Sequence, residues 1–216
     1  MTKHKMSENE NIPSTITQRE RYKHKYNLVE MYRVFIKIPD ALSKFIKNKK
    51  AKTVNPQFIE RLQLAVTEVN GCAVCSFVHA QLALKEGMNN DEIFSFLNGD
   101  NKFVKPQEAK AILFAQHYAD SEGFPNQSSF DAIVVEYGEE KAGIMLAAIQ
   151  LMMAGNVYGI PQSAFKSRLN GKKYKDSSLF YELSMQIVGI LFLPLALLHG
   201  WLKKLLGFKM QKFKPE

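Results

Sequence analysis

The chain has few cysteines, no run of alternating apolar and polar residues and no glycine-rich phosphate loop. With 2 cysteines in 216 residues, a network of disulfides cannot hold the fold together, and a chain of this length buries a sufficient core without one. Apolar residues recur at helical spacing along most of the chain, whereas strands would need alternation. We therefore expect an all-α protein without internal repeats.

The sequence also lacks an export signal and a nucleic-acid-binding motif, which limits the expected cellular location and binding partners. The start of the chain, Met1 to Glu8, has no apolar run of the kind that export signals carry, so we expect a cytoplasmic protein. The lysines that give the net charge of +8 are spread along the chain without a recognised nucleic-acid-binding motif, so we expect no nucleic-acid partner. In the reducing cytoplasm, a close pair of cysteines is more often catalytic than structural.

The two cysteines that are present, Cys72 and Cys75, form a C-x-x-C pair and are followed by His79. A disulfide between them would close only a tiny loop, which suits a redox pair that opens and closes. On an α-helix, positions i and i+4 share a face, with Cβ atoms roughly 6 Å apart. His79 can therefore reach the sulfur of Cys75 and take its proton.

The residues around the pair predict that a helix begins there. Asn70-Gly71 is a turn sequence, the pattern is helical from Ala73 onward, and Gly87 is a natural stop. Cys72 then lies at the N-cap and Cys75 in the first turn, where unpaired N–H groups and the helix dipole stabilise a thiolate. Thiol pKa values in such positions can fall from about 8.5 to roughly 3.5–7.5.

Glu60 is a candidate third member of the site. It lies on a predicted helix from Pro56 to Glu68, which precedes the turn into the cysteine helix. Its carboxylate could hold a water or orient His79. Glu68 is a second candidate carboxylate, and an exposed surface glutamate is the simpler alternative for Glu60.

Two other interpretations of the cysteines were weighed. A half zinc site would need further ligands, and none of the remaining histidines lies at zinc-finger spacing, so we expect no metal. Two buried, inert thiols would not account for the spacing to His79 and Glu60. The remaining histidines are His4, His24, His117 and His199.

Glu60, followed by Asn70-Gly71-Cys72-x-x-Cys75-x-x-x-His79 and Gly87-Met88, resembles the motif of the AhpD-like (alkylhydroperoxidase) branch of the carboxymuconolactone decarboxylase superfamily. The resemblance covers roughly residues 28–165, and Gly155-Asn156-Val157-Tyr158-Gly159 resembles the asparagine-bearing final helix of such domains. It implies an all-helical homo-oligomer that reduces hydroperoxides, as an antioxidant enzyme, or disulfides through the C-x-x-C pair. It also implies no bound cofactor and an external dithiol donor of the lipoamide or thioredoxin type.

The resemblance assigns a role to each site residue. Cys75 would be the attacking thiolate, Cys72 the resolving thiol, His79 the base and Glu60 the orienting or proton-relaying carboxylate. The best-studied pattern has a histidine directly before the second cysteine, and this chain has Val74 there, so the relay through that position is missing. The alternative functions are a thiol–disulfide oxidoreductase with little peroxidase activity and a non-catalytic oligomeric scaffold.

The chain divides by composition into three parts. We expect a flexible polar arm over residues 1–18, an AhpD-like helical domain over 19–175 and an apolar, lysine-flanked helical extension over 176–216. Two boundaries within the domain are predicted from prolines: a break at Pro39 and the end of a long apolar helix near Pro161.

The apolar part of the extension, Leu183 to Leu202, contains no charged side chain and is long enough to cross a bilayer, which needs ~20 apolar residues. Pro194 in its middle and lysines on both sides argue against a plain span, because a span would carry one lysine cluster outside. We expect it to pack on the helical core or on a neighbouring subunit. The alternative is contact with an anionic membrane surface, with Trp201 at the interface and the protein peripheral to the membrane.

Overall fold

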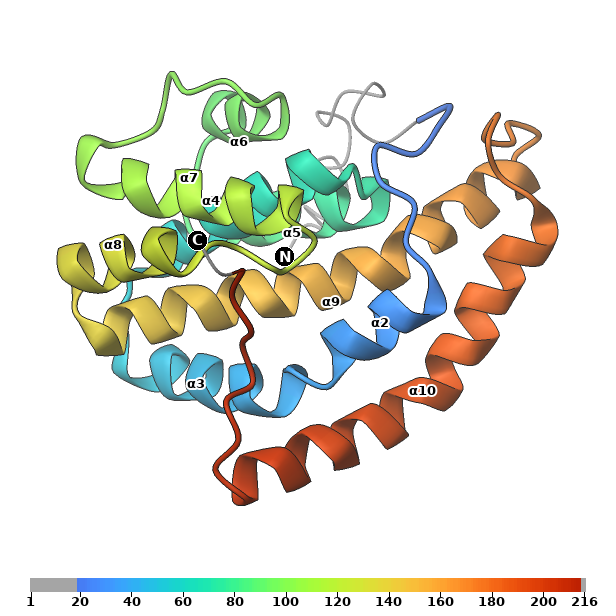
Figure 1. The fold of residues 1–216 in the computed structure, drawn as a ribbon. Helices are drawn as coiled ribbons and strands as arrows, with labels where there is room; N and C mark the ends of the chain where they lie inside the picture. Colours follow the sequence, from blue (N-terminus) through green and yellow to red (C-terminus); the bar gives the residue numbers. More distant parts are fainter. Residues whose placement is uncertain (1–18, 215–216) are drawn as a thin grey trace, which may run out of the picture.

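The computed structural model describes residues 19–214, and the polar arm predicted over 1–18 lies outside the described residues. Within the described part, the chain forms α-helices and no β-strand, which confirms the predicted all-α class; Asn126 and Lys214 make one isolated bridge. The helices, shown in Figure 1, are α2 (Leu28–Phe35), α3 (Ile38–Ala51), α4 (Pro56–Asn70), α5 (Ala73–Lys85), α6 (Asn90–Leu97), α7 (Ala109–Asp120), α8 (Gln127–Tyr137), α9 (Glu139–Leu169) and α10 (Leu179–Leu205), with a short 3-10 helix η2 (Pro106–Glu108).

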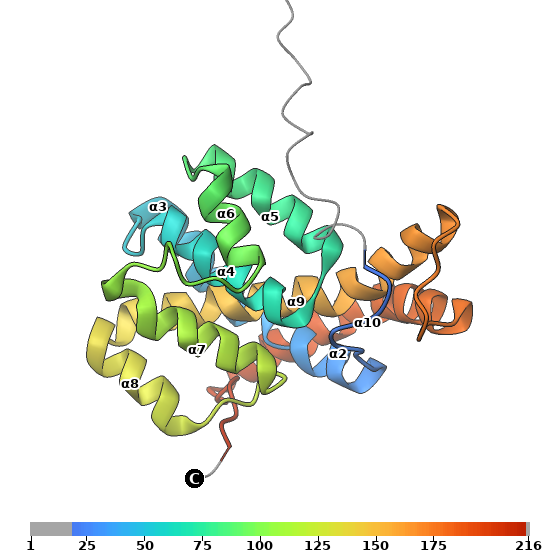
Figure 2. The same ribbon diagram turned by 90° about the horizontal axis from the view of Figure 1, so that it is seen from above.

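The helix α9 is the centre of the molecule. It packs against α2, α3, α4, α5, α7, α8 and α10, and it contributes fully buried Met145, Ile149 and Met153 to the core. The helices α4 to α7 lie on one side of it, and α2, α3 and α10 on the other (Figures 1 and 2). The two halves of the fold thus share α9 as a common wall.

Several helix ends follow from local chemistry. Asn27 caps α2 in a capping box, because its side chain accepts from the Glu30 amide while the Glu30 carboxylate accepts from the Asn27 amide. Asn55 caps α4 ahead of Pro56, where a missing N–H costs nothing. Gly71 ends α4 with a φ of 75°, in the left-handed region that glycine adopts without strain.

The predicted break at Pro39 was slightly misplaced. The chain leaves helical geometry between α2 and α3, and Pro39 lies in the first turn of α3. A proline in the first turn needs no backbone donor, so it starts this helix rather than interrupting one.

The prediction that α9 ends near Pro161 was wrong, because the helix continues to Leu169 with Pro161 inside it. An interior proline costs about 3 kcal/mol or more through a lost hydrogen bond and a steric clash. Ile160, Pro161 and Ala164 are all buried, so this stretch packs on both sides. Tertiary packing therefore outweighs the local preference to stop.

The predicted extra apolar helix at the C-terminal end is present as α10, which contains Pro194 and packs on α2, α3 and α9. In the described residues, α9 and α10 are both long and apolar enough to cross a bilayer. In the most apolar stretch of α9, 78% is buried, against 22% in α10. Hence α9 is a core helix, whereas α10 covers the core with one face and leaves the other exposed.

The segment after α10 returns to the core through Gln211. The Gln211 Oε1 atom accepts from the Lys37 amine at 3.1 Å, the Tyr118 hydroxyl at 2.8 Å and the Gln150 amide at 3.0 Å. Burial, and secondarily the nearby Arg33 charge, lowers the pKa of Lys37 to about 8. This contact ties the C-terminal residues to α3, α7 and α9.

Candidate functional site

The site is built on the α4–α5 hairpin. The left-handed turn at Gly71 reverses the chain, and Cys72 follows as the N-cap of α5, as the sequence predicted. The Cys72 Sγ atom accepts a hydrogen bond from the Cys75 amide at 3.2 Å, so a sulfur takes the place of a usual capping oxygen. The first turn of α5 thus presents a backbone donor to this sulfur.

Cys72 and Cys75 are joined by a disulfide, so the C-x-x-C pair is in its oxidised form. Both residues are buried, with Cys72 0% exposed and Cys75 6% exposed, so Cys75 is the more exposed residue of the pair.

Glu60 and His79 form a pair beside the cysteines. The His79 Nδ1 atom lies 3.0 Å from Glu60 Oε2, with Glu60 on α4 and His79 on α5. The Glu60 residue is buried and the His79 ring is mostly so. The other candidate carboxylate, Glu68, instead pairs with Lys23. The fold brings together all four predicted site residues on one hairpin and sets Glu68 apart from His79.

The helix α9 closes the disulfide from the other side through Gly159. A Cβ atom on Gly159 would lie 2.8 Å from each of the Cys72 and Cys75 sulfurs, which is closer than real contacts allow. From the sequence we expected Gly159 to lie on an apolar helix, and we did not predict this contact with the disulfide. A glycine inside a helix costs about 1 kcal/mol relative to alanine. Its presence there was the one signal in the sequence that another group approaches the α9 backbone closely.

Asn156, one turn before this contact, lies in the α4–α9 interface. It is fully buried, and its Oδ1 atom accepts from the Thr67 hydroxyl at 3.2 Å. Its Nδ2 atom has no partner among the described residues. The asparagine thus holds α9 against the helix that carries Glu60.

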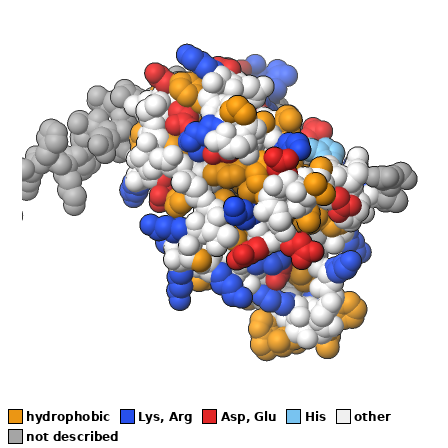
Figure 3. Space-filling model, turned by 90° about the vertical axis from the view of Figure 1, so that its left-hand side faces the viewer, with side chains coloured by type: hydrophobic (Ala, Val, Ile, Leu, Met, Phe, Trp, Pro, Cys, Tyr) orange, Lys and Arg blue, Asp and Glu red, His pale blue; other side chains and the backbone are white. Residues whose placement is uncertain are grey.

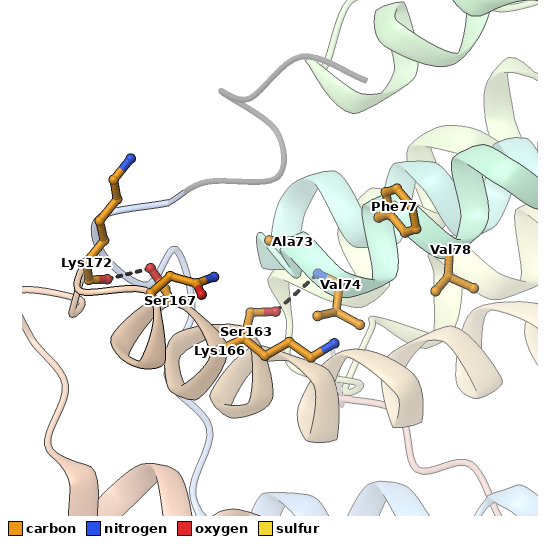
Figure 4. A pocket seen from close by; sticks show the side chains of 9 residues that line it. Ala73, Val74, Phe77, Val78, Ser163, Lys166, Ser167 and Lys172 are labelled. Atoms are coloured by element: carbon orange, nitrogen blue, oxygen red, sulfur yellow. Dashed lines mark hydrogen bonds between the residues drawn. The ribbon is translucent and has the colours of Figure 1, made fainter. Parts of the chain in front are cut away.

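A surface hollow of about 620 Å³ opens beside the cysteine pair, between α5 and the C-terminal part of α9 (Figure 4). One wall is apolar, and the opposite wall carries serines and lysines. The Val74 amide donates to Ser163 Oγ at 3.1 Å, and that hydroxyl donates to the Gly159 carbonyl at 2.7 Å. The lining includes Ala73, Val74, Phe77, Val78, Ser163 and Lys166.

The histidines considered for a zinc site are dispersed in the fold. His24 pairs with Glu122, His117 accepts from the Asn126 amide, and His199 bonds Tyr32, while His4 lies outside the described residues. Within residues 19–214, no group of three or more His, Cys, Asp or Glu side chains has an arrangement that could hold a metal ion.

An all-α fold with an oxidised C-x-x-C pair at a helix start, flanked by a carboxylate–imidazole pair, defines a helical protein with the parts for thiol redox chemistry. Residues 37–116 match the model of the Carboxymuconolactone decarboxylase family, a stretch that includes all four site residues. This match covers less than half of the chain, and it agrees with the resemblance to the carboxymuconolactone decarboxylase superfamily. Comparison with curated proteins and with solved structures gave no match.

Proposed function

We propose that this protein is an AhpD-like, thiol-dependent peroxide reductase whose Cys72–Cys75 pair cycles between dithiol and disulfide. The observation that supports it most is the placement of the disulfide at the start of α5, next to the Glu60–His79 pair. A disulfide that served stability alone would gain nothing from a buried carboxylate–imidazole pair beside it.

The proposed oxidative half-reaction begins with the Cys75 thiolate. Its sulfur attacks one oxygen of a hydroperoxide; the S–O bond forms as the O–O bond breaks, and the other oxygen leaves as an alcohol with a proton returned by His79. The Cys75 sulfur is thereby oxidised to a sulfenic acid. Cys72 then attacks this sulfur, which releases water and forms the disulfide.

The reductive half-reaction needs an external dithiol of the lipoamide or thioredoxin type. A donor thiolate attacks the sulfur of Cys75, the more exposed residue of the pair, and the Cys72 sulfur leaves as a thiolate. The Cys75 amide, which already donates to the Cys72 sulfur, stabilises this leaving group. The second donor thiol then displaces Cys75 and leaves the donor as a disulfide.

Glu60 orients the base in this scheme. When its carboxylate accepts the proton on His79 Nδ1, the imidazole keeps Nε2 as its basic nitrogen. Nε2 is then the atom that takes the proton of the Cys75 thiol. The His79 position on the same face of α5 as Cys75 suits this transfer.

A second candidate is a thiol–disulfide oxidoreductase with little peroxidase activity. Val74 occupies the position of the histidine in the best-studied family pattern, and it lines the hollow beside the pair. An apolar wall at this point contributes no proton relay, but it offers a docking surface for a dithiol or disulfide partner.

Peroxide turnover with a panel of dithiol donors tests the proposal. We expect hydroperoxide consumption that requires a donor and is lost when both cysteines are serine. Disulfide reduction without peroxide consumption would support the second candidate instead. A chain that reduces neither peroxide nor disulfides, and that shows no peroxide-dependent loss of two protons at Cys72 and Cys75 in mass spectrometry, would be a non-catalytic scaffold.

Three further expectations accompany the proposal: a homo-oligomer, a cytoplasmic location, and an apolar, lysine-flanked extension over 176–216 that follows the AhpD-like domain. Light scattering and cell fractionation measure the first two. The third is addressed by the surface of α10.

A further inference from the structure

The outer face of α10 carries a continuous set of large apolar side chains. We define this outer face by six residues that are between 51% and 63% exposed. In Figure 3, hydrophobic side chains gather at the lower edge of the molecule, with lysine and arginine side chains above them. The six residues are Ile187, Ile190, Leu191, Leu195, Leu198 and Trp201.

The inner face of α10 is made mostly of small residues where it meets the core, together with Met185 and Phe192. Gly189, Ala196 and Gly200 are buried. A Cβ atom on Gly200 would lie 2.1 Å from the Ile36 carbonyl oxygen, so the two backbones touch. A helix on a water-soluble core ordinarily turns its large apolar residues inward. Here close backbone packing leaves them no room, and they face outward.

The polar side chains in the uncharged part of α10 bond to the protein. Ser184 donates to the Tyr181 carbonyl, Gln186 donates to the Tyr158 carbonyl, and the His199 ring meets the Tyr32 hydroxyl. No charged side chain occurs between Leu183 and Leu202. The outer face therefore presents an unbroken apolar surface, of a kind that marks interaction sites when it is large.

Positive charge flanks this surface at both ends. Lys203, Lys204 and Lys209 follow it directly, and Lys173 and Lys175 precede it. Of these, Lys204 pairs with Asp40 and Lys175 with Glu20. Two copies paired through this face would bring lysine-bearing ends together whether the helices ran parallel or antiparallel. An anionic surface complements both ends at once, and Trp201 is a residue type enriched at membrane interfaces.

We propose that the outer face of α10 is a membrane-surface anchor that docks the protein on an anionic lipid bilayer. The helix lies in the interface and does not span the bilayer. Its inner face is packed on α2, α3 and α9. Its first turn is held by Glu182, which is fully buried and accepts from Arg168 at 2.7 and 2.8 Å. Only the outer face is available to lipid.

This anchor is independent of the proposed redox chemistry, and it leaves the cysteine hollow uncovered. On α9, the Tyr158 ring approaches Gly189 of α10, whereas Gly159 approaches the disulfide. The helix α9 thus lies between α10 and the cysteines. Lipid bound at α10 does not reach the hollow on α5.

Trp201 provides the test, because it is the only tryptophan in the chain. We expect its emission to shift to shorter wavelength on addition of phosphatidylcholine–phosphatidylglycerol vesicles and to be quenched by lipids brominated in the acyl chain. The protein should float with these vesicles more than with phosphatidylcholine alone, and added salt should weaken binding.

Matched variants separate the two contributions to binding. Leu191→Gln with Leu198→Gln should lower the partition coefficient at least tenfold. Leu113→Gln with Val135→Gln, on α7 and α8, should not change it, although these apolar residues are more exposed than Leu191 and Leu198. Replacing Lys203, Lys204 and Lys209 by glutamine should lower it roughly 100-fold. Replacing Lys47, Lys49 and Lys50 on α3 by glutamine, which removes the same charge, should have a much smaller effect.

Two results would overturn the anchor. One is a Trp201 shift that follows protein concentration and not lipid, together with a doubled mass in light scattering that Leu191→Gln with Leu198→Gln abolishes. The outer face would then be an interface between copies of the chain. The other is an unshifted Trp201 and no flotation of the intact protein at low salt.

Discussion

The helices α9 and α10 are both long and apolar, and each contains a proline, yet they occupy opposite environments. In its most apolar stretch α9 is 78% buried, and α10 is 22% buried. The difference comes from their neighbours, because α9 contacts helices on every side and α10 contacts α2, α3 and α9 on one side. The two helices are similarly apolar, so composition alone does not determine burial. The number of neighbouring helices determines how much of the apolar surface stays exposed.

The glycines of the two helices show the same contrast. Gly159 brings the α9 backbone against the Cys72–Cys75 disulfide, while Gly189 and Gly200 bring the α10 backbone against the core. The first glycine allows α9 to approach the disulfide, and the other two allow α10 to pack closely on the core. If this division holds, changes on the α5 side of α9 alter thiol chemistry only, and changes on α10 alter lipid binding only.

The largest expected effect is from the cysteines. Cys75→Ser should abolish peroxide consumption, because it removes the attacking sulfur, while flotation with anionic vesicles stays unchanged. Cys72→Ser should leave a sulfenic acid on Cys75 that a dimedone probe traps. A sulfenic acid trapped on Cys72 in the Cys75→Ser protein would reverse the assigned roles.

The acid–base pair comes next. His79→Ala should slow turnover by about 10²–10⁴-fold, as loss of a general base does, and should slow alkylation of the reduced protein by iodoacetamide at neutral pH. Glu60→Gln should reduce turnover with a smaller effect on alkylation, since it acts by orienting the imidazole. Glu68→Gln is the control, because Glu68 pairs with Lys23. Equal turnover in all three folded variants and the unaltered protein would exclude the proposed relay.

The third prediction concerns Lys37, whose amine donates to Gln211 on the segment that follows α10. Burial lowers the pKa of Lys37 to about 8 from 10.5, so between these values the unfolded chain binds more protons than the folded one. Stability should therefore rise with pH from about 8 towards 10, by roughly 2–3 kcal/mol at most. Above pH 10 ionising tyrosines reverse the trend, because burial raises the pKa of Tyr118 in the fold.

Denaturant unfolding at a series of pH values measures this slope. Lys37→Met should flatten it, whereas Lys47→Met, on an exposed part of α3, should keep it. A slope that survives Lys37→Met would mean that another group causes it and that Gln211 does not seal a lysine in the core.

The smallest expected effect sharpens the role of the α9 glycine. Gly159→Ala should destabilise the oxidised protein by about 1–3 kcal/mol, because its Cβ has no room beside the two sulfurs. Gly155→Ala, one turn earlier, meets only Met152 Cε at 3.7 Å and should be neutral or stabilising by up to about 1 kcal/mol. Chemical denaturation of both oxidised variants gives the comparison. Equal stabilities would show that α9 yields easily at the disulfide.

Much of the site could be read from the sequence because it rests on interactions within a few residues. The Asn55-Pro56 start of α4, the turn at Gly71 and the N-cap position of Cys72 all follow from capping and backbone preferences. The shared face of Cys75 and His79 follows from helical geometry alone.

Other features were decided by tertiary structure. Which carboxylate meets His79 depends on how α4 and α5 cross, and spacing along α4 left Glu60 and Glu68 both open. The contact of Gly159 with the disulfide joins residues far apart in the chain, and no local pattern encodes it.

The prolines in α9 and α10 also show that local sequence preferences do not by themselves determine where a helix ends. The sequence by itself determined an all-α chain with a redox-type cysteine pair and a long apolar extension, because periodicity, capping and spacing are local properties. It predicted that α9 ends near Pro161, but burial around that residue carries the helix on to Leu169. Pro194 likewise lies inside α10, with one face covered and the other bare. Only tertiary packing decides such outcomes, because the summed free energy of many buried contacts exceeds the local cost of one proline.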